Sequence, residues 1–104
     1  MGAAGQTRPK IVVAGSINID LATDLPFLPK PNETLIGGDL RLAVGGKGHN
    51  QAVALARLGC DTHFIGAVGD DNYGELALAH FAETGVDAAF VARRKGKVTG
   101  TALI

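Results

Sequence analysis

Residues 45–59 read GGKGHNQAVALARLG, with three glycines in the first four positions and an almost entirely apolar segment that ends at Gly59. The residues just before them, 40–44, alternate between apolar and other side chains as a strand does. The predicted local order is therefore strand, glycine loop and helix. The start of such a helix has unpaired N–H groups and a partial positive charge, and glycines let a polar ligand approach the backbone closely. We expect Lys47 and Asn50 to reach that ligand.

Two familiar phosphate motifs do not fit this loop. A P-loop has Ser or Thr after Gly-Lys, where this chain has Gly48. A dinucleotide-binding fingerprint that begins at Gly46 has glycine at its sixth position, where this chain has Gln51. From the loop alone, a simple glycine turn before a buried helix therefore stays open beside a ligand site.

Composition excludes several function classes. The 104 residues are enough for one small domain, and 46% hydrophobic with 19% charged residues indicates a globular chain. Ten basic and ten acidic residues balance, which argues against a nucleic-acid partner. One cysteine excludes an internal disulfide and fits the cytoplasm, and no apolar run is long enough for a membrane span. We expect residues 1–9 to be a flexible tail.

The first predicted strand is followed by two polar residues whose spacing matches the two-residue period of a strand. Residues 10–15 contain a continuous apolar run, typical of a strand buried on both faces at the centre of a parallel sheet. Asn18 and Asp20 follow, two positions apart, so in an extended segment both side chains point to one face. A carboxylate beside an amide can hold several hydroxyls of a sugar. An Asx turn at the end of the strand is the alternative.

Prolines and glycines divide the rest of the chain. Prolines at 26, 29 and 31 predict an edge strand followed by a loop, in which Asn32 can adopt a left-handed conformation. The segment 47–58 is apolar nearly all round, which predicts a buried helix capped by Gly59. The next strand, 62–68, is expected to bury Phe64, Ile65 and Val68 and to pair in parallel with the first.

A second helix and a basic turn complete the pattern. Asn72 and Glu75 predict a capped helix start, and Gly85 predicts its end. Residues 93–97 are basic and lie between two extended runs, 90–92 and 98–104. They are most simply a solvated hairpin turn. His49, His63 and His80 show no metal-binding spacing, and we expect no metal site in the chain.

Several ordered motifs together resemble the ribokinase, or pfkB, family of carbohydrate kinases. The glycine loop and its helix match the first signature of that family, and further matches precede and follow it over roughly residues 10–104. The matching segments are Gly15 to Asp20, Pro29 to Thr34, Gly45 to Gly59, Val68 to Gly74 and Thr99 to Ala102.

The resemblance implies an α/β fold, a ribokinase-like parallel sheet with helices, plus a small β-sheet lid built from about 21–44 and 90–104. It implies phosphoryl transfer from ATP to a primary hydroxyl of a sugar, ribose first, with Mg²⁺, a monovalent cation such as K⁺, and a homodimer formed through the lid. It places substrate-binding residues at Asn18, Asp20, Gly45, Gly46, Lys47, Gly48 and Asn50.

The chain departs from the family in its length and at one loop position. The family's chains are much longer, and their nucleotide, metal and catalytic motifs lie downstream of the part matched here. We therefore expect an N-terminal part of a kinase, truncated after the first core strands and helices, with no catalytic residue before Ile104 and no activity of its own. His49 stands where the family often has alanine. A sister kinase for fructose or a nucleoside, and a non-catalytic sugar-binding or interaction module, remain alternatives.

Overall fold

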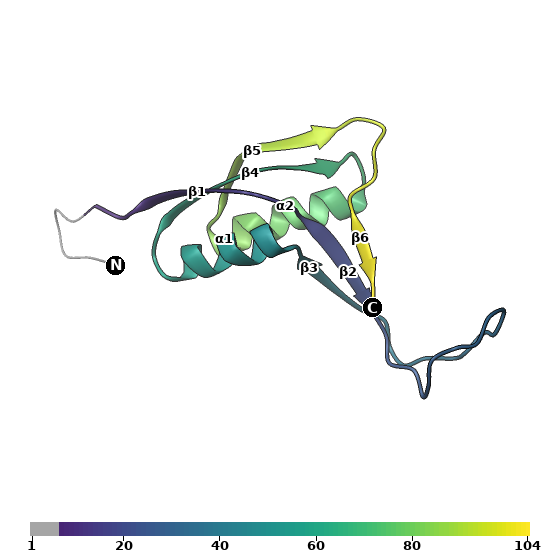
Figure 1. Cartoon of the computed structure of the whole chain (residues 1–104). Helices are drawn as coiled ribbons and strands as arrows, with labels where there is room; N and C mark the ends of the chain where they lie inside the picture. Colours follow the sequence, from purple (N-terminus) through teal and green to yellow (C-terminus); the bar gives the residue numbers. More distant parts are fainter. Residues whose placement is uncertain (1–6) are drawn as a thin grey trace.

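The computed structural model describes residues 7–104, so the part of the predicted tail at positions 1–6 lies outside it. Residues 7–9 contain no helix or strand. The elements, shown in Figure 1, alternate between strands and helices in the middle of the chain. Their bounds are β1 Lys10–Ala14, β2 Asn18–Ala22, β3 Arg41–Gly45, α1 Lys47–Arg57, β4 Asp61–Gly69, α2 Asn72–Thr84, β5 Asp87–Arg94 and β6 Thr101–Leu103.

The main sheet is parallel and has the order β1-β4-β5. Both helices lie on the same side of it (Figure 1). The core between them contains Phe64 from β4 and Phe81 from α2, whose fully buried rings have centroids 5.0 Å apart. These elements confirm the predicted α/β class and the parallel pairing of the first strand with the strand after α1.

The opposite face of this sheet is open in the described part of the chain, and three burial predictions are corrected here. β1 is an edge strand and not a central one, and Val12 is 56% exposed. Ile65, expected inside, is 47% exposed because it points away from the helices. α1 is likewise buried along one stripe only, and Leu58 at its end is 80% exposed. Continuous apolar runs predict burial on both sides, but in the described residues only one side of these elements has a partner.

A second, smaller sheet has the order β3-β2-β6. β2 pairs antiparallel with β3 and parallel with β6, so it is the central strand and not the predicted edge strand. Residues 23–40 contain no helix or strand and form the long loop that extends beyond this sheet in Figure 1. Asn32 in that loop has φ 64°, which confirms its predicted left-handed conformation.

The basic run does not form the predicted hairpin turn. β5 pairs with β4 in the main sheet, whereas β6 pairs with β2 in the small sheet. Residues 90–94 therefore belong to the parallel sheet, and the expectation that the whole of 90–104 lies in the lid is wrong. Arg93 also forms ion pairs with Asp70 and Glu75, so it is not simply solvated.

Glycines with positive φ mark the C-terminal ends of both helices, and an aspartate caps the start of α2. Gly59, with φ 93°, comes just after α1, and Gly85, with φ 86°, caps α2, as predicted. The N-cap of α2 is Asp71 and not Asn72, because the Asp71 carboxylate accepts a hydrogen bond from the amide of Gly74. None of the helices in residues 7–104 is long and apolar enough to cross a membrane.

Candidate functional site

The predicted polar pair lies at the start of β2. Asn18 donates a hydrogen bond from Nδ2 to Oδ1 of Asp20 over 2.7 Å, which confirms that the two side chains share one face of the strand. Across the ladder, Asn18 lies opposite Gly45 and Asp20 lies opposite Ala43. Because both partners on β3 are small, the carboxylate and amide are not covered from that side.

The glycine loop packs so closely against this pair and the preceding backbone that a Cβ at three of its positions would overlap neighbouring atoms. A Cβ at Gly45 would overlap the carboxylate of Asp20. Gly46 has φ 104°, and a Cβ there would overlap the carbonyl oxygen of Ser16. A Cβ at Gly48 would meet the backbone of Gly15 at 2.9 Å. Glycine is therefore required at positions 46 and 48 by close approach to the backbone of residues 15 and 16, whereas a larger residue at position 45 would displace the Asp20 carboxylate.

The first turn of α1 lies at the same place, where two of its amides are already paired and the Lys47 ammonium group is a free donor. No side chain caps this helix and its first turn has no acidic residue. The amide of His49 donates to the carbonyl of Ser16 over 3.2 Å, and that of Asn50 donates to the carbonyl of Gly46 over 2.9 Å. Lys47 is exposed and forms no hydrogen bond or ion pair with other residues in the range 7–104. Its ammonium group is free to meet a ligand.

All seven predicted residues therefore lie together, at the junction of β2, β3 and α1. Two of the glycines, Gly45 and Gly48, are buried and shape the loop, while Lys47 and Asn50 are exposed. The assembled chemistry is one carboxylate, two amides, one ammonium group and a helix N-terminus. This set can accept and donate hydrogen bonds to a polyhydroxylated ligand.

One contact at this junction was not predicted. His49 is buried, and its Nε2 lies 3.0 Å from Nδ1 of His80 on α2, while its Nδ1 lies 2.9 Å from Oδ1 of Asn50. Burial lowers the pKa of His49 below its ordinary value of 6.5, against the raising effect of the Asn50 hydrogen bond. The two histidines are 31 positions apart on different helices. Sequence spacing gives no sign of this contact, which depends on how the helices pack.

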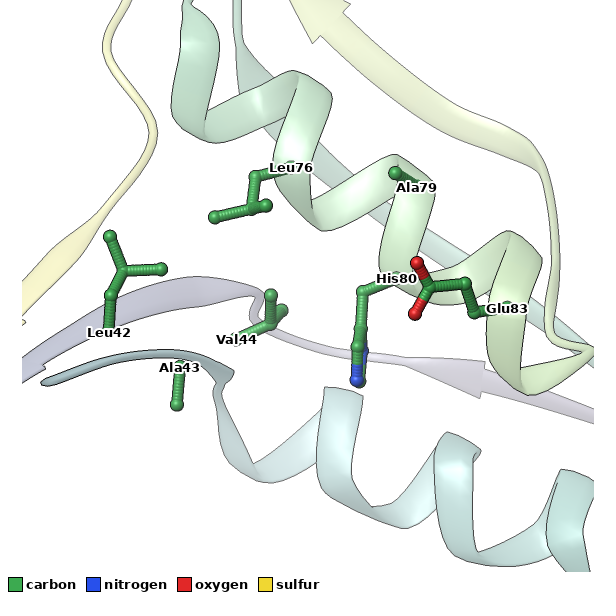
Figure 2. A pocket seen from close by; sticks show the side chains of 7 residues that line it. All are labelled: Leu42, Ala43, Val44, Leu76, Ala79, His80 and Glu83. Carbon is green, nitrogen blue, oxygen red and sulfur yellow. The ribbon is translucent and has the colours of Figure 1, made fainter.

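A cavity of about 320 Å³ lies beside this junction, between β3 and α2. In Figure 2, Leu42 and Val44 project toward α2, and His80 points from α2 toward the start of α1. Asn18 and Asp20 lie on the other face of the small sheet, since they pair with the alternate positions of β3. None of the seven predicted residues lines the cavity, which is lined by Leu42, Ala43, Val44, Leu76, Ala79, His80 and Glu83.

The acids of this part of the chain do not form a metal site. No group of three or more metal-binding side chains occurs in the described residues. Asp71 uses its carboxylate oxygens to accept from Gly74 and Thr99, and Asp70 lies 3.9 Å from Arg93. Asp71 is therefore committed to the start of α2, whereas Asp70 faces Arg93 on β5.

Comparisons with known proteins give consistent matches. A family model described as pfkB family carbohydrate kinase matches residues 8–104. Ribokinase of Haemophilus influenzae is 42% identical over 97 residues, which is 93% of this chain and 32% of the relative. A solved structure of Arabidopsis thaliana ribokinase, complexed with ribose and ATP, has a TM-score of 0.80 and 34% identity and covers 94% of this chain. Ribokinase from Giardia lamblia has a TM-score of 0.83 and 35% identity, with 94% of this chain and 32% of that chain covered. The chain thus spans about a third of the length of the curated relatives it matches.

Proposed function

Since the chain belongs to the pfkB family of carbohydrate kinases, we propose that it is the N-terminal, sugar-binding part of an ATP-dependent ribose kinase. The complete protein would convert ribose and ATP to ribose 5-phosphate and ADP. The observation that supports this most directly is the Asn18–Asp20 pair, which a loop of close-packed glycines holds open beside the start of α1. The relatives named ribokinase support ribose as the first sugar to test.

In this proposal each side chain of the site has a separate role. Asp20 accepts hydrogen bonds from sugar hydroxyls, and Asn18 orients it through the 2.7 Å bond. Lys47 and Asn50 donate to the sugar from the first turn of α1. Gly45, Gly46 and Gly48 let the sugar approach the backbone. These groups bind and orient a hydroxyl, and they do not activate it.

ATP, Mg²⁺ and a monovalent cation such as K⁺ belong to the complete enzyme in this proposal. Both carboxylate oxygens of Asp71 are engaged by Gly74 and Thr99, and Asp70 belongs to no group of three metal-binding side chains in the described residues. We therefore assign no catalytic or metal-binding residue to the described residues, and expect those groups downstream of Ile104. Phosphoryl transfer needs metal ions and a group that orients the nucleophile, and this part of the chain supplies neither.

Assembly and location are part of the same proposal. The small sheet exposes apolar side chains, with Leu42 44% and Leu103 83% exposed. Apolar residues on an exposed sheet favour pairing with a second copy, so we propose a homodimer formed through this lid. The single cysteine and the sugar substrate fit a cytoplasmic protein. Light scattering of the purified complete protein tests the dimer.

The deciding experiment has two steps. The first is to read the coding sequence beyond codon 104; a stop codon there contradicts the proposal and favours a non-catalytic sugar-binding module. The second is to express the complete reading frame, called the complete protein below, and to measure ADP formation with ATP and magnesium. The sugar panel contains ribose, fructose and nucleosides. Ribose giving the highest kcat/KM supports the proposal, and another substrate giving it assigns the protein to a sister activity.

A further inference from the structure

His49 is held at both nitrogens of its ring. The side chain is 2% exposed. Its Nδ1 lies 2.9 Å from Oδ1 of Asn50, and its Nε2 lies 3.0 Å from Nδ1 of His80. Its ring also packs against the rings of His80 and Phe81, with centroids 5.0 Å and 5.2 Å away. A buried polar ring with two partners is fixed in position and in the placement of its proton.

The partners set the direction of the hydrogen bonds. An amide oxygen only accepts, so Nδ1 of His49 carries the hydrogen and donates to Asn50. In the neutral ring Nε2 then has no hydrogen and accepts, so His80 donates from its Nδ1. The order of donation runs from His80 through His49 to Asn50. The Asn50 oxygen thereby selects the tautomer of His49, and His49 in turn selects that of His80.

This order determines what Asn50 can offer to a ligand. Its oxygen is occupied by His49, while its exposed Nδ2 has two hydrogens to donate. We propose that His49 is a positioning residue, which holds the Asn50 amide so that Asn50 binds the sugar only as a donor. The inference rests on the proposed function, because it assigns a role toward the sugar at the same site.

The other side chains of the site offer few hydrogen-bond donors, so a fixed donor at Asn50 adds to sugar binding. Asp20 can only accept, and Nδ2 of Asn18 already donates to Asp20. Sugar oxygens that must accept a hydrogen bond are therefore left with the second hydrogen of the Asn18 amide, the Asn50 amide and the Lys47 ammonium group. Without His49, the Asn50 amide could rotate and present its oxygen, which would replace a donor by an acceptor facing the same sugar oxygen. Holding the amide in one orientation removes that unproductive state.

Burial favours the neutral form of His49 that this order of hydrogen bonds requires. Titratable groups face His49 from two elements, His80 from α2 and Asp20 from β2; Glu83 lines the same cavity as His80, and Lys47 precedes His49 on α1. Burial outweighs the Asn50 hydrogen bond and lowers the pKa of His49 below its ordinary value.

The test compares His49→Ala with His49→Gln in the complete protein. We expect His49→Ala to raise the sugar KM roughly 5- to 30-fold with little change in kcat, because a ground-state binding contact loses its orientation. Glutamine can still donate to Asn50, so His49→Gln should keep the KM within about 3-fold of wild type. His63→Gln, on the far face of the main sheet, is the matched histidine control.

A double-mutant cycle separates positioning from general destabilisation. If His49 acts through Asn50, His49→Ala added to Asn50→Ala should not raise the KM further. An equal rise in both backgrounds would overturn the inference, as would a rise with His63→Gln of the same size. The two-bond ¹H–¹⁵N spectrum of the wild-type imidazoles is an independent readout. It must show the His49 proton on Nδ1, and a proton on Nε2 alone overturns the inference even if a variant fails to fold. Absence of sugar turnover by wild type would instead contradict the proposed function.

Discussion

Asp71 and Thr99 are joined by two hydrogen bonds across 28 positions of the chain: the Thr99 hydroxyl donates over 2.6 Å and its amide over 2.9 Å. The same carboxylate caps α2 through Gly74. The Thr99 hydroxyl oxygen in turn accepts from the amide of Gly69 at the end of β4. Because Thr99 lies two residues before β6, these bonds connect the main sheet to the small sheet that carries Asn18 and Asp20.

Asp71→Ala should therefore destabilise the complete protein more than Asp71→Asn does. Asparagine keeps an oxygen that can cap the helix, whereas alanine removes every acceptor. The two variants are compared by urea denaturation at pH 7. Asp39→Ala is the control, because Asp39 is an exposed acid of the long loop that forms no hydrogen bond or ion pair through its side chain within residues 7–104. Equal stability of Asp71→Ala and wild type would contradict the role assigned to this carboxylate.

The Asp71 contribution should also depend on pH in one direction. The Thr99 hydroxyl, and then its amide, hold the pKa of Asp71 below its ordinary value of 3.8. The ionised form is thus favoured by folding, so its stabilisation is full above the unfolded pKa and disappears as the pH falls through the lower folded pKa. The stability difference between wild type and Asp71→Asn should be constant near neutrality and shrink below about pH 4. A difference that grows on acidification would contradict this sign.

Gly46→Ala and Gly59→Ala form a matched pair, since both glycines have positive φ, 104° and 93°. The Cβ of an alanine at position 59 would have no other atom within 4 Å. The free energy of unfolding of Gly59→Ala should therefore fall only by the cost of the left-handed backbone, about 1–2 kcal/mol. Alanine at Gly46 also overlaps the backbone carbonyl of Ser16, so we expect a larger loss of stability and a raised sugar KM. Urea denaturation and sugar kinetics measure both. Equal losses would show that the close approach at Gly46 is unimportant.

Asp20→Ala should weaken sugar use by the complete protein. Each charge-assisted hydrogen bond to a sugar hydroxyl is worth about 1.5–3 kcal/mol, so the loss of two corresponds to roughly 10²–10⁴-fold in kcat/KM. Asp24→Ala is the matched control. Asp24 lies in the long loop and forms an exposed ion pair with Arg41 at the start of β3, so its loss should leave kcat/KM near wild type. Sugar kinetics of Asp20→Ala close to those of wild type would remove Asp20 from the site.

Local signals in the sequence predicted most of the elements and several of their ends. Gly59 and Gly85 lie in the left-handed conformation that only glycine adopts easily, so the helix ends could be read directly. The two-residue spacing of Asn18 and Asp20 predicted their shared face because side chains on a strand alternate. The glycine loop was placed between strand and helix by its neighbours, and the family resemblance linked it to the polar pair.

Long-range pairing could not be read from local pattern. β5 and β6 each contain a short apolar run, and nothing in those runs indicates that the two strands belong to different sheets. The contact between His49 and His80 depends on the packing of two helices, which leaves no spacing signal. Asp71 and Asn72 are both good N-cap residues, and the bonds from Thr99 favour Asp71.

The face of the main sheet opposite the helices is the clearest physical reason to expect that residues 1–104 are unstable when expressed by themselves. Val12, Ile65 and Phe90 share this face and are 56%, 47% and 68% exposed. Parallel sheets are normally covered on both faces, and contiguous exposed apolar surface of this kind favours association.

We expect this 104-residue chain alone to phosphorylate no sugar and to associate in solution. Binding residues only position a hydroxyl, whereas transfer also needs metal ions on the phosphates and donors for the developing charge, and the described acids at 70 and 71 are engaged elsewhere. The measurements are ADP formation with ATP, magnesium and ribose, and light scattering at several concentrations. Phe90→Lys should reduce association without creating activity. Val98→Lys is the matched control, because Val98 is an apolar residue that is 83% exposed and lies outside the sheet. Turnover above that of a denatured sample, abolished by Asp20→Ala, would show that the chemistry lies within these residues after all.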